Sequence, residues 1–505
     1  ALGATRGRIT RQLLIETSVL AMIACTVGCL VAWLGMKGVN LFIHQKAWNN
    51  VASEAVIELN SPVLLFAIGI ALVTTLVSGL APALHVARGD LQPHLVGSGK
   101  GVGGKFSKGT LRAALVISEV TLCMVLLVGA GLMTRSFFVL KHIDLGFNPK
   151  NILILSFAPS NGNGPNMAKA ISPQEETTRE EVVERLKALP GIVDVTVQDA
   201  LPGYNGGWPS QFILPGASHI EAGSLDGGDE NLFQTLGFHQ ISGNWLSQQD
   251  VQAARRAAVI NQRLARDFFG DANPVGQQIE VKVPKTTLRP ALDELFEIVG
   301  VVGDVKNFGP QQPAKPMVFI PNTIRGSFMI LLKTSVKSSS MVRAVEQQVW
   351  AVNPNEIVGL CDPLEDFLQQ HTYATPEFGV IISTPVAAVG LLLVVIGIFS
   401  VMAYTVSLQS REIGIRMALG GQQSTILKMI LGRGAQLIAL GMVIGLFASY
   451  ALTRFLASQI WGVSATDPWT FAVVVTLIAV AGLAACFIPV RRAMKVDPMV
   501  ALRHE

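Results

Sequence analysis

The chain has 505 residues, enough for several domains, and half of these residues are hydrophobic. Only 15% are charged, whereas soluble globular domains carry about 25%, so the composition argues against an ordinary soluble enzyme. The net charge of +4 is small for this length and gives no argument for nucleic-acid binding.

Six apolar stretches are long enough to cross a bilayer, whose hydrocarbon core requires about 20 residues of helix. In chain order they are residues 17–36, 59–87, 111–134, 378–410, 434–453 and 469–490. The third stretch contains Glu119, which would cost about 3 kcal/mol if it faced lipid. We therefore predict an all-α membrane bundle of about six transmembrane helices.

Basic residues gather in the segments on one side of these stretches. They are Arg6, Arg8, Arg11, Arg88, Lys100, Lys105, Lys108, Arg112, Arg411, Arg416, Lys428, Arg491, Arg492, Lys495 and Arg503. The positive-inside rule makes these segments cytoplasmic. The large polar region at about 136–376 then lies on the opposite side of the membrane, together with the short loops 37–62 and 455–468.

The polar region contains two strand–helix–strand patterns. The predicted elements are a strand at 151–156, a helix at 173–189 and a strand at 193–197, then a strand at 328–333, a helix at 341–352 and a strand at 356–360. Two such units can pair into one ferredoxin-like sheet. Between them, the segment at about 205–325 is rich in turns and is predicted to contain a strand at 296–302. We predict an α+β domain with an inserted second lobe.

The two apolar ends of the chain resemble each other. Ala1-Leu2-Gly3 matches Ala418-Leu419-Gly420, and the same offset places Glu16 opposite Arg433. Opposite charges at equivalent positions suggest a pair between the two repeats, although each side chain could instead reach its own membrane interface. The repeat predicts two tandem units, as expected for a pseudo-symmetric transporter.

The repeat divides the chain into five parts. Residues 1–100 hold the last two transmembrane helices of a first unit, whose earlier helices and outer domain we expect upstream. The second unit comprises a cytoplasmic linker at 101–112, a first transmembrane helix at 113–135, the outer domain at 136–376 and a three-helix membrane domain at 377–505.

No motif in the sequence indicates catalysis. The segment from Gly99 to Phe106 approaches a phosphate-binding P-loop, but Phe106 stands where a magnesium-binding Ser or Thr is needed, so a flexible linker explains it better. Neighbouring Asp229 and Glu230 suggest solvated loop carboxylates, and the histidines lack metal-ligand spacing. We predict that this chain has no catalytic, cofactor-binding or metal site and is not an enzyme.

Three sets of motifs carry a family resemblance. The run from Arg411 to Gly420, with residues 489–493 and 496–503 at the end, resembles the FtsX-like permease domain. The outer region is similar to the periplasmic core domain of macrolide-exporter (MacB-like) permeases at residues 236–237, 241–243, 259–263, 273–276 and 298–303. The repeat resembles the duplicated orphan permeases of that family.

The resemblance implies a permease subunit of an ABC transporter of the mechanotransmission type, in the bacterial cytoplasmic (inner) membrane, with a ferredoxin-like porter lobe. ATP would be bound only by a separate cytoplasmic ATPase. The ATPase would dock at Arg411, Glu412, Ile413, Gly414, Ile415, Arg416, Met417, Ala418, Leu419 and Gly420. Physically, this segment suggests an amphipathic element on the membrane face or an ordinary basic loop.

The family leaves the cargo open, because its members export macrolides or peptides, extract lipoproteins or regulate cell-wall hydrolases. The alternative hypothesis is a membrane scaffold or signalling protein that moves no cargo and relays conformational change to a periplasmic partner. Either protein would have membrane lipid and a periplasmic partner as neighbours, and we expect no nucleic acid.

Overall fold

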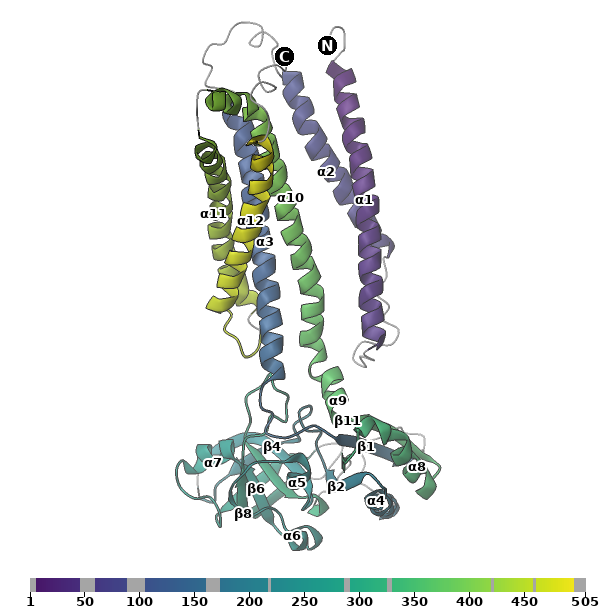
Figure 1. Ribbon diagram of the computed structural model, residues 1–505. Helices are drawn as coiled ribbons and strands as arrows, with labels where there is room; N and C mark the ends of the chain where they lie inside the picture. The colour runs from purple at the N-terminus through teal and green to yellow at the C-terminus, as the bar shows by residue number, and fades with distance from the viewer. Residues whose placement is uncertain are drawn as a thin grey trace. The chain divides into compact units, whose positions relative to one another are not determined.

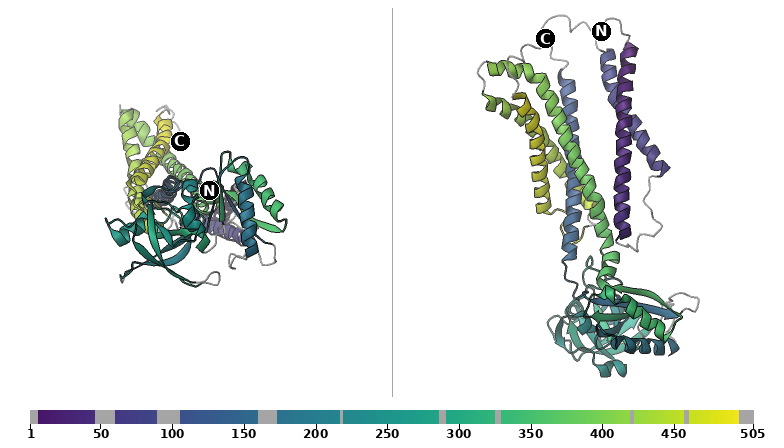
Figure 2. Two further views of the ribbon diagram at one scale, coloured as in Figure 1. Left: turned by 90° about the horizontal axis from the view of Figure 1, so that it is seen from below. Right: turned by 45° about the vertical axis from the view of Figure 1, so that its right-hand side comes forward.

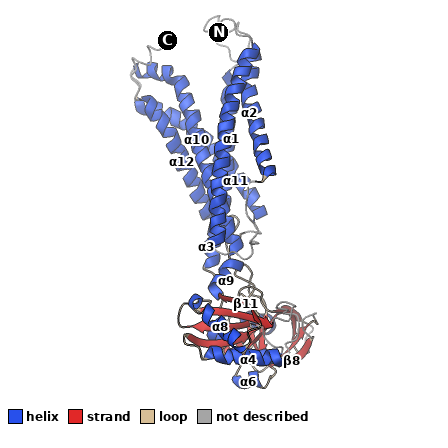
Figure 3. Ribbon diagram, turned by 90° about the vertical axis from the view of Figure 1, so that its right-hand side faces the viewer, coloured by secondary structure: helices blue, strands red, loops and turns tan. Residues whose placement is uncertain are grey.

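The computed structural model describes residues 6–45, 60–88, 105–159, 173–216, 219–285, 291–324, 329–418, 422–456 and 460–494. The chain divides into two compact units. The first, here called the helical unit, comprises Ala1–Val128, Ser383–Ala451 and Phe471–Glu505. The second, the α+β unit, comprises Gly129–Ile382 and Leu452–Thr470, and it contains the strands drawn in red in Figure 3.

Six long helices carry the apolar sequence (Figure 1). They are α1 (Arg6–Gln45), α2 (Ser61–Arg88), α3 (Lys105–Lys141), α10 (Ala374–Ala418), α11 (Gln423–Leu456) and α12 (Pro468–Met494). Five of them contain a stretch apolar and long enough to span a membrane: Ile15–Leu41, Arg112–Lys141, Ala374–Gln409, Leu427–Phe455 and Pro468–Arg491. These five predicted spans are confirmed by length and composition. In α2 the described apolar part, Ser61–Thr75, is shorter, so a sixth span remains a prediction.

The long helices expose large apolar side chains that a water-soluble bundle would bury. Phe447 and Phe455 on α11 are 74% and 80% exposed, and Val473 on α12 is also exposed. A continuous apolar exterior is stable only in lipid, where helices also satisfy their own backbone hydrogen bonds. These helices therefore have the surface expected of membrane-spanning segments.

In the α+β unit, the two predicted strand–helix–strand patterns pair into one antiparallel sheet of order β11-β1-β10-β2. Its elements are β1 (Ile152–Pro159), α4 (Pro173–Lys187), β2 (Ile192–Gln198), β10 (Met329–Thr334), α8 (Val342–Val352) and β11 (Glu356–Pro363). Val182 and Leu186 of α4 and Val345 of α8 are fully buried in one cluster with strand residues. The apolar stripes of both helices therefore cover this sheet.

The insertion between β2 and β10 forms a closed ring of six strands. They are β3 (Trp208–Ile213), β4 (Ile220–Gly228), β6 (Ala257–Asn261), β7 (Gln278–Val283), β8 (Leu292–Val302) and β9 (Met317–Pro321). Pairing runs β4-β3-β7-β8-β6-β9, and β9 returns to β4 as a parallel neighbour. All six strands contribute to one buried cluster, which includes Phe212, Phe296 and Val318. Closure removes the free edges at which sheets associate.

Short elements complete the α+β unit. They are α5 (Leu232–Leu236), β5 (Gln240–Gly243), which pairs with β8, α6 (Gln248–Gln252), α7 (Gln262–Phe269), the one-turn helices Asn322–Ile324 and Ser338–Ser340, and α9 (Leu364–His371). Phe233 of α5 lies in a third buried cluster, with Ile154 of the four-stranded sheet and Phe319 of the ring. Because both lobes contribute to this cluster, they share one core.

Two carboxylates at the end of β4, one buried and one partly exposed, hold the end of β2. Asp226 is 2% exposed and accepts the backbone N–H of Ala200 at 3.0 Å. Burial, reinforced by the nearby charge of Asp199, raises the pKa of Asp226 to about 8. Asp229 accepts hydrogen bonds from the side chain of Thr196 and from the N–H of Val197, at 2.8 Å.

The expectation that Asp229 is a solvated loop carboxylate is therefore wrong. Its oxygens are engaged by β2, and burial raises its pKa to about 6. Two neighbouring carboxylates on a loop are usually hydrated, but here β2, which pairs with β4, leaves Asp229 only partly exposed and supplies donors that replace part of its water.

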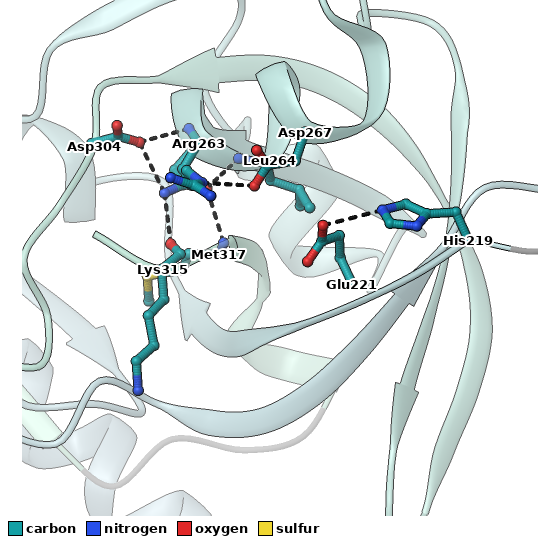
Figure 4. Close-up of polar contacts among 9 residues, drawn as sticks. His219, Glu221, Arg263, Leu264, Asp267, Asp304, Lys315 and Met317 are labelled. Atoms are coloured by element: carbon teal, nitrogen blue, oxygen red, sulfur yellow. Dashed lines mark hydrogen bonds and ion pairs between the residues drawn. The ribbon is translucent and has the colours of Figure 1, made fainter. Parts of the chain in front are cut away.

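A buried asparagine, Asn261, fastens the ring at the end of β6, and Figure 4 labels its partners Leu264, Asp304, Lys315 and Met317. Asn261 is fully buried, and its Oδ1 accepts the N–H groups of Leu264, at 3.2 Å, and Met317, at 2.9 Å. Its Nδ2 donates to Asp304 Oδ1 at 3.1 Å and to the carbonyl of Lys315 at 2.9 Å. The amide thus satisfies all four of its hydrogen-bonding positions while capping α7.

We predict that Asn261→Ala lowers the free energy of unfolding of the α+β unit by about 3 kcal/mol, because buried partners lose their hydrogen bonds. Asn231→Ala is the matched control, since Asn231 caps α5 without a side-chain bond. Its cost should be below about 0.5 kcal/mol. Pulse proteolysis of the detergent-solubilised chain in urea measures the free energy of unfolding of both variants. Equal decreases in the two variants would contradict the role of Asn261.

Stability of the α+β unit should decrease as the pH rises from about 4 to about 8. In that window the folded chain keeps a proton on Asp226, whose pKa is about 8, whereas the unfolded chain has lost it. Asp226→Asn removes this proton linkage, so its melting temperature should fall less between pH 5 and pH 8 than that of the wild type. Asp271→Asn, at an exposed position, should follow the wild-type profile.

Candidate functional site

The predicted ATPase-docking segment lies at the end of α10. Residues 411–418 form the last two turns of this helix, although their alternating sequence left the helical period unclear. Leu419 and Gly420 lie outside the described residues, and α11 begins at Gln423. The described part of the segment, residues 411–418, is thus helical. Its binding of an ATPase stays a prediction.

The predicted pair between the repeats also stays a prediction. Glu16 lies on α1 and Arg433 on α11, and both side chains are exposed. Within the residues that the structure describes, no ion pair joins them.

In the helical unit, α3 and α11 approach each other at two glycines one turn apart. A Cβ on Gly441 would lie 2.7 Å from Cβ of Val120, and one on Gly445 would lie 2.7 Å from Cβ of Met124. The hydroxyl of Thr121 donates to the carbonyl of Gly441 at 3.1 Å. Small residues spaced four apart allow membrane helices to pack closely and to exchange such hydrogen bonds.

Other glycines serve the remaining contacts of this bundle. A Cβ on Gly397 of α10 would collide with the carboxylate of Glu119 on α3, and one on Gly482 of α12 would lie 2.8 Å from Ile438 of α11. Glu119 therefore lies against α10 and is partly buried, which lowers the cost that a carboxylate facing lipid would have. The four helices are therefore held at short distances, and a displacement of one displaces its neighbours.

Two helices continue from the helical unit into the α+β unit. We call residues 129–141 of α3 and 374–382 of α10 the stalk ends. The right-hand view of Figure 2 shows both helices as long ribbons, blue and green. An unbroken hydrogen-bonded helix transmits an axial or tilting displacement along its length with little internal change.

Beyond the stalk end of α3, the chain is bonded to two places in the insertion between β2 and β10. The carbonyl of Leu145 accepts the N–H of Lys306, which follows β8, at 2.9 Å, and the N–H of Asn148 donates to Leu236 of α5 at 2.8 Å. Between them Gly146 has φ +77, and a Cβ there would collide with the carbonyl of Asp304. The segment that follows α3 therefore packs closely against the backbone at Asp304.

The stalk end of α10 is preceded by α9, which is packed against loops of the α+β unit. The rings of Phe367 and His371 stack at 4.0 Å, and Tyr204 meets Phe367 edge-on at 5.2 Å. Thr372 Oγ1 donates to the carbonyl of Gly203 at 3.0 Å, while Gln311 Nε2 donates to the carbonyl of Thr372 at 2.8 Å. Loops before β3 and after β8 thus hold the same turn.

The base of the stalk is held by hydrogen bonds and by stacked rings. In the described part of the chain, no three His, Cys, Asp or Glu side chains are grouped as a metal site would need. Sequence patterns did not indicate the residues at the base of the stalk, because each contact joins positions far apart in the chain. The one local signal that could have indicated this contact is the glycine at position 146, which lies close to a helix end.

Gly441→Ala and Gly445→Ala should each destabilise the helical unit, by about 1–3 kcal/mol, because the added methyl group meets α3 at under 3 Å. Gly432→Ala on the same helix is the matched control, since a Cβ there meets nothing within 4 Å. Thermal unfolding of the purified chain in detergent measures the difference, and equal melting temperatures for all three variants would refute the close packing of α3 on α11.

Two family models match this chain. The model described as the MacB-like periplasmic core domain matches residues 113–352, somewhat N-terminal to the outer domain expected at 136–376. The model described as the FtsX-like permease C-terminal domain matches two parts, residues 1–91 and 386–498. These two parts coincide with the copies of the internal repeat, and together the models span most of the chain.

Curated relatives agree with these models. The chain is 26% identical over 330 residues to the pyoverdine export ATP-binding/permease protein PvdT of Pseudomonas syringae pv. syringae, covering 58% of this chain and 46% of the relative. It is 27% identical over 275 residues to the macrolide export ATP-binding/permease protein MacB of Marinobacter nauticus, covering 52% and 41%. The chain thus spans about half the length of the curated relatives it matches.

Among solved structures, the periplasmic region of MacB from Actinobacillus actinomycetemcomitans matches 46% of this chain and 96% of its own, with 16% identity and a TM-score of 0.31. The apolar helices and the two family models agree on one assignment. This multi-pass membrane protein belongs to the family of FtsX-like and MacB-like ABC transporter permeases.

Proposed function

We propose that this chain is the permease of an ABC transporter of the mechanotransmission type in a bacterial inner membrane. The observation that carries the proposal is that α3 and α10 each run as one apolar helix from the helical unit into the α+β unit, where the residues flanking their ends are bonded to its loops. Such helices can convey motion started at one membrane face to a domain on the other.

A separate cytoplasmic ATPase would bind the segment from Arg411 to Gly420 and supply the energy, so ATP would be bound by that partner and not by this chain. The helical backbone of residues 411–418 supports this assignment, because a short rigid end of α10 would transfer a push from the ATPase directly into that helix. The basic side of the membrane, where this segment lies by the positive-inside rule, is also where an ATPase would be found.

The α+β unit would be the moving part on the periplasmic side. Its sheet of order β11-β1-β10-β2, covered by two helices, has the connectivity of a ferredoxin-like porter lobe. The match of the FtsX-like model to both ends of the chain supports the duplicated type, in which one polypeptide supplies two permease modules. The relatives' names suggest export of a substrate, without choosing among pyoverdine, macrolides or another compound.

The second candidate is a scaffold that moves no cargo and relays conformational change to a periplasmic partner. It uses the same helices and the same stalk ends. A shared core between the two lobes supports it equally, because a stiff α+β unit can present a binding surface to a partner as well as it can push a substrate. The transporter needs an ATPase to supply its energy and the scaffold does not, so binding of an ATPase distinguishes the two candidates.

The deciding experiment is co-purification of the detergent-solubilised protein with the ATPases of its host. Wild type should retain an ABC ATPase, and Arg411→Glu/Arg416→Glu should reduce the retained amount at least about tenfold, since reversing two charges at a docking segment costs more than about 1.4 kcal/mol. The retained ATPase is identified by mass spectrometry.

The matched control reverses two positive charges elsewhere, on α4. Arg185→Glu/Lys187→Glu changes the net charge equally, at exposed residues that pair with Glu181 and Glu184. This variant should retain ATPase like the wild type. If the wild type retains no ATPase, the proposed coupling to an ATPase is wrong and the scaffold becomes the better explanation. If both double variants lose the ATPase equally, the assignment of the docking segment to residues 411–420 is wrong.

A further inference from the structure

The loop between α11 and α12 is fastened to the stalk end of α3. Ser136 of α3 is 2% exposed, and its hydroxyl makes two hydrogen bonds of 2.7 Å to Trp461, accepting from the backbone N–H and donating to the carbonyl. A single buried side chain thus satisfies both backbone groups of a loop residue that is distant in the chain.

A second contact lies at the adjacent position of α3. Arg135 forms an ion pair with Asp467, the residue before α12. Asp467 is nearly buried, and it also accepts the N–H and the hydroxyl of Thr470, at 2.9 and 2.7 Å, as the cap of α12. Burial opposes the ionisation of Asp467, but the bonds from Thr470 and the charge of Arg135 outweigh it and hold its pKa below the ordinary value.

The third contact sets the distance between loop and helix. Gly462 has φ +69, and a Cβ at this position would lie 2.8 Å from Cγ1 of Val139. A larger residue would therefore push the loop away from α3. Residues 135, 136 and 139 lie within one turn of the helix, so the three contacts form a single attachment.

These contacts differ from those of an ordinary interfacial anchor. A snorkelling arginine reaches water or lipid headgroups without a fixed partner. Here Arg135 is paired with a carboxylate that is itself immobilised by α12, and the neighbouring position is committed to the loop backbone. The attachment connects a stalk helix with the start of α12, which lies more than 300 residues later in the chain.

We propose that residues 460–467 act as a coupling strut, which makes the stalk end of α3 and the start of α12 move as one body. The strut rests on the proposed function: displacement of α12 would reach the α+β unit through α3 as well as along α10. Arg135, Ser136 and Asp467 are positioning residues in this scheme, because they transmit motion and touch neither ATP nor cargo.

The experiment uses the full chain with the ATPase retained in the co-purification, and compares hydrogen–deuterium exchange with and without ATP plus vanadate. In the wild type, ATP should change exchange in residues 142–151, which follow the stalk end of α3. Asp467→Asn, which keeps the cap oxygen but removes the charge, and Arg135→Gln should each reduce this change at least about twofold while retaining the ATPase.

Two comparisons separate coupling from general damage. If the two residues act through one ion pair, the double variant should lose no more of the change than either single variant. Arg185→Gln on α4, which breaks an exposed ion pair with Glu181, should leave the ATP-dependent change intact. Loss of the change in this control as well would overturn the assignment to the strut.

A disulfide tests whether loop and helix stay together. An ideal Cβ at Gly462 lies 3.8 Å from Cβ of Val139, the typical separation across a disulfide. Val139→Cys/Gly462→Cys, combined with Cys25→Ala and Cys29→Ala, should form the bridge on oxidation and keep the full ATP-dependent change. Loss of the change on oxidation, with recovery on reduction, would show that the loop must leave α3 and would overturn the strut.

Failure of the strut is distinguishable from failure of the proposed function. If the wild type shows no ATP-dependent change, the energised permease is wrong and the strut falls with it. If the wild type responds and Asp467→Asn and Arg135→Gln respond equally, only the strut is wrong, and α10 is left as the route to the α+β unit.

Discussion

The structure depends on one constraint: the backbone of α3 and α10 must stay helical wherever it is surrounded by lipid. In hydrocarbon, every N–H and C=O must be satisfied within the helix, so a break there would cost several kcal/mol. Both helices continue through their apolar spans, Arg112–Lys141 and Ala374–Gln409, to loops of the α+β unit, and α10 does so despite Pro385, which lacks a backbone N–H. The same requirement that makes them stable in a membrane makes them stiff enough to carry motion.

Stiffness alone is insufficient unless both ends are held. In the helical unit, glycines at 397, 441 and 445 let side chains of one helix enter the space of another, which leaves little freedom for sliding. At the other end, buried hydroxyls of Ser136 and Thr372 hold loop backbone. Hydrogen bonds from buried side chains hold these loops well, because a buried polar group left without a partner costs more free energy than its hydrogen bond contributes.

The sequence predicted much of the fold. The strands predicted at 151–156 and 193–197 and the helix predicted between them at 173–189 were found within a few residues. The ring was missed because β6 and β9 are buried at every position and show no alternation, and because closure joins β4 to β9 across about 90 residues. The stalk contacts left no local pattern, and the docking segment was found only through family resemblance.

The place where the ring is inserted has an evolutionary consequence. Gln198, at the end of β2, pairs with Met329, at the start of β10, so the chain leaves and re-enters the four-stranded sheet at adjacent points. An insertion with neighbouring ends can be lengthened, shortened or replaced without changing the register of the sheet that carries it. Such exchange is constrained by the side chains that meet the shared core, such as Phe319, and by the hydrogen bonds from the insertion to β2 and to the residues flanking α3 and α10. Descendants of one permease could therefore acquire new specificities by exchanging this lobe, while the helices that drive it stay the same.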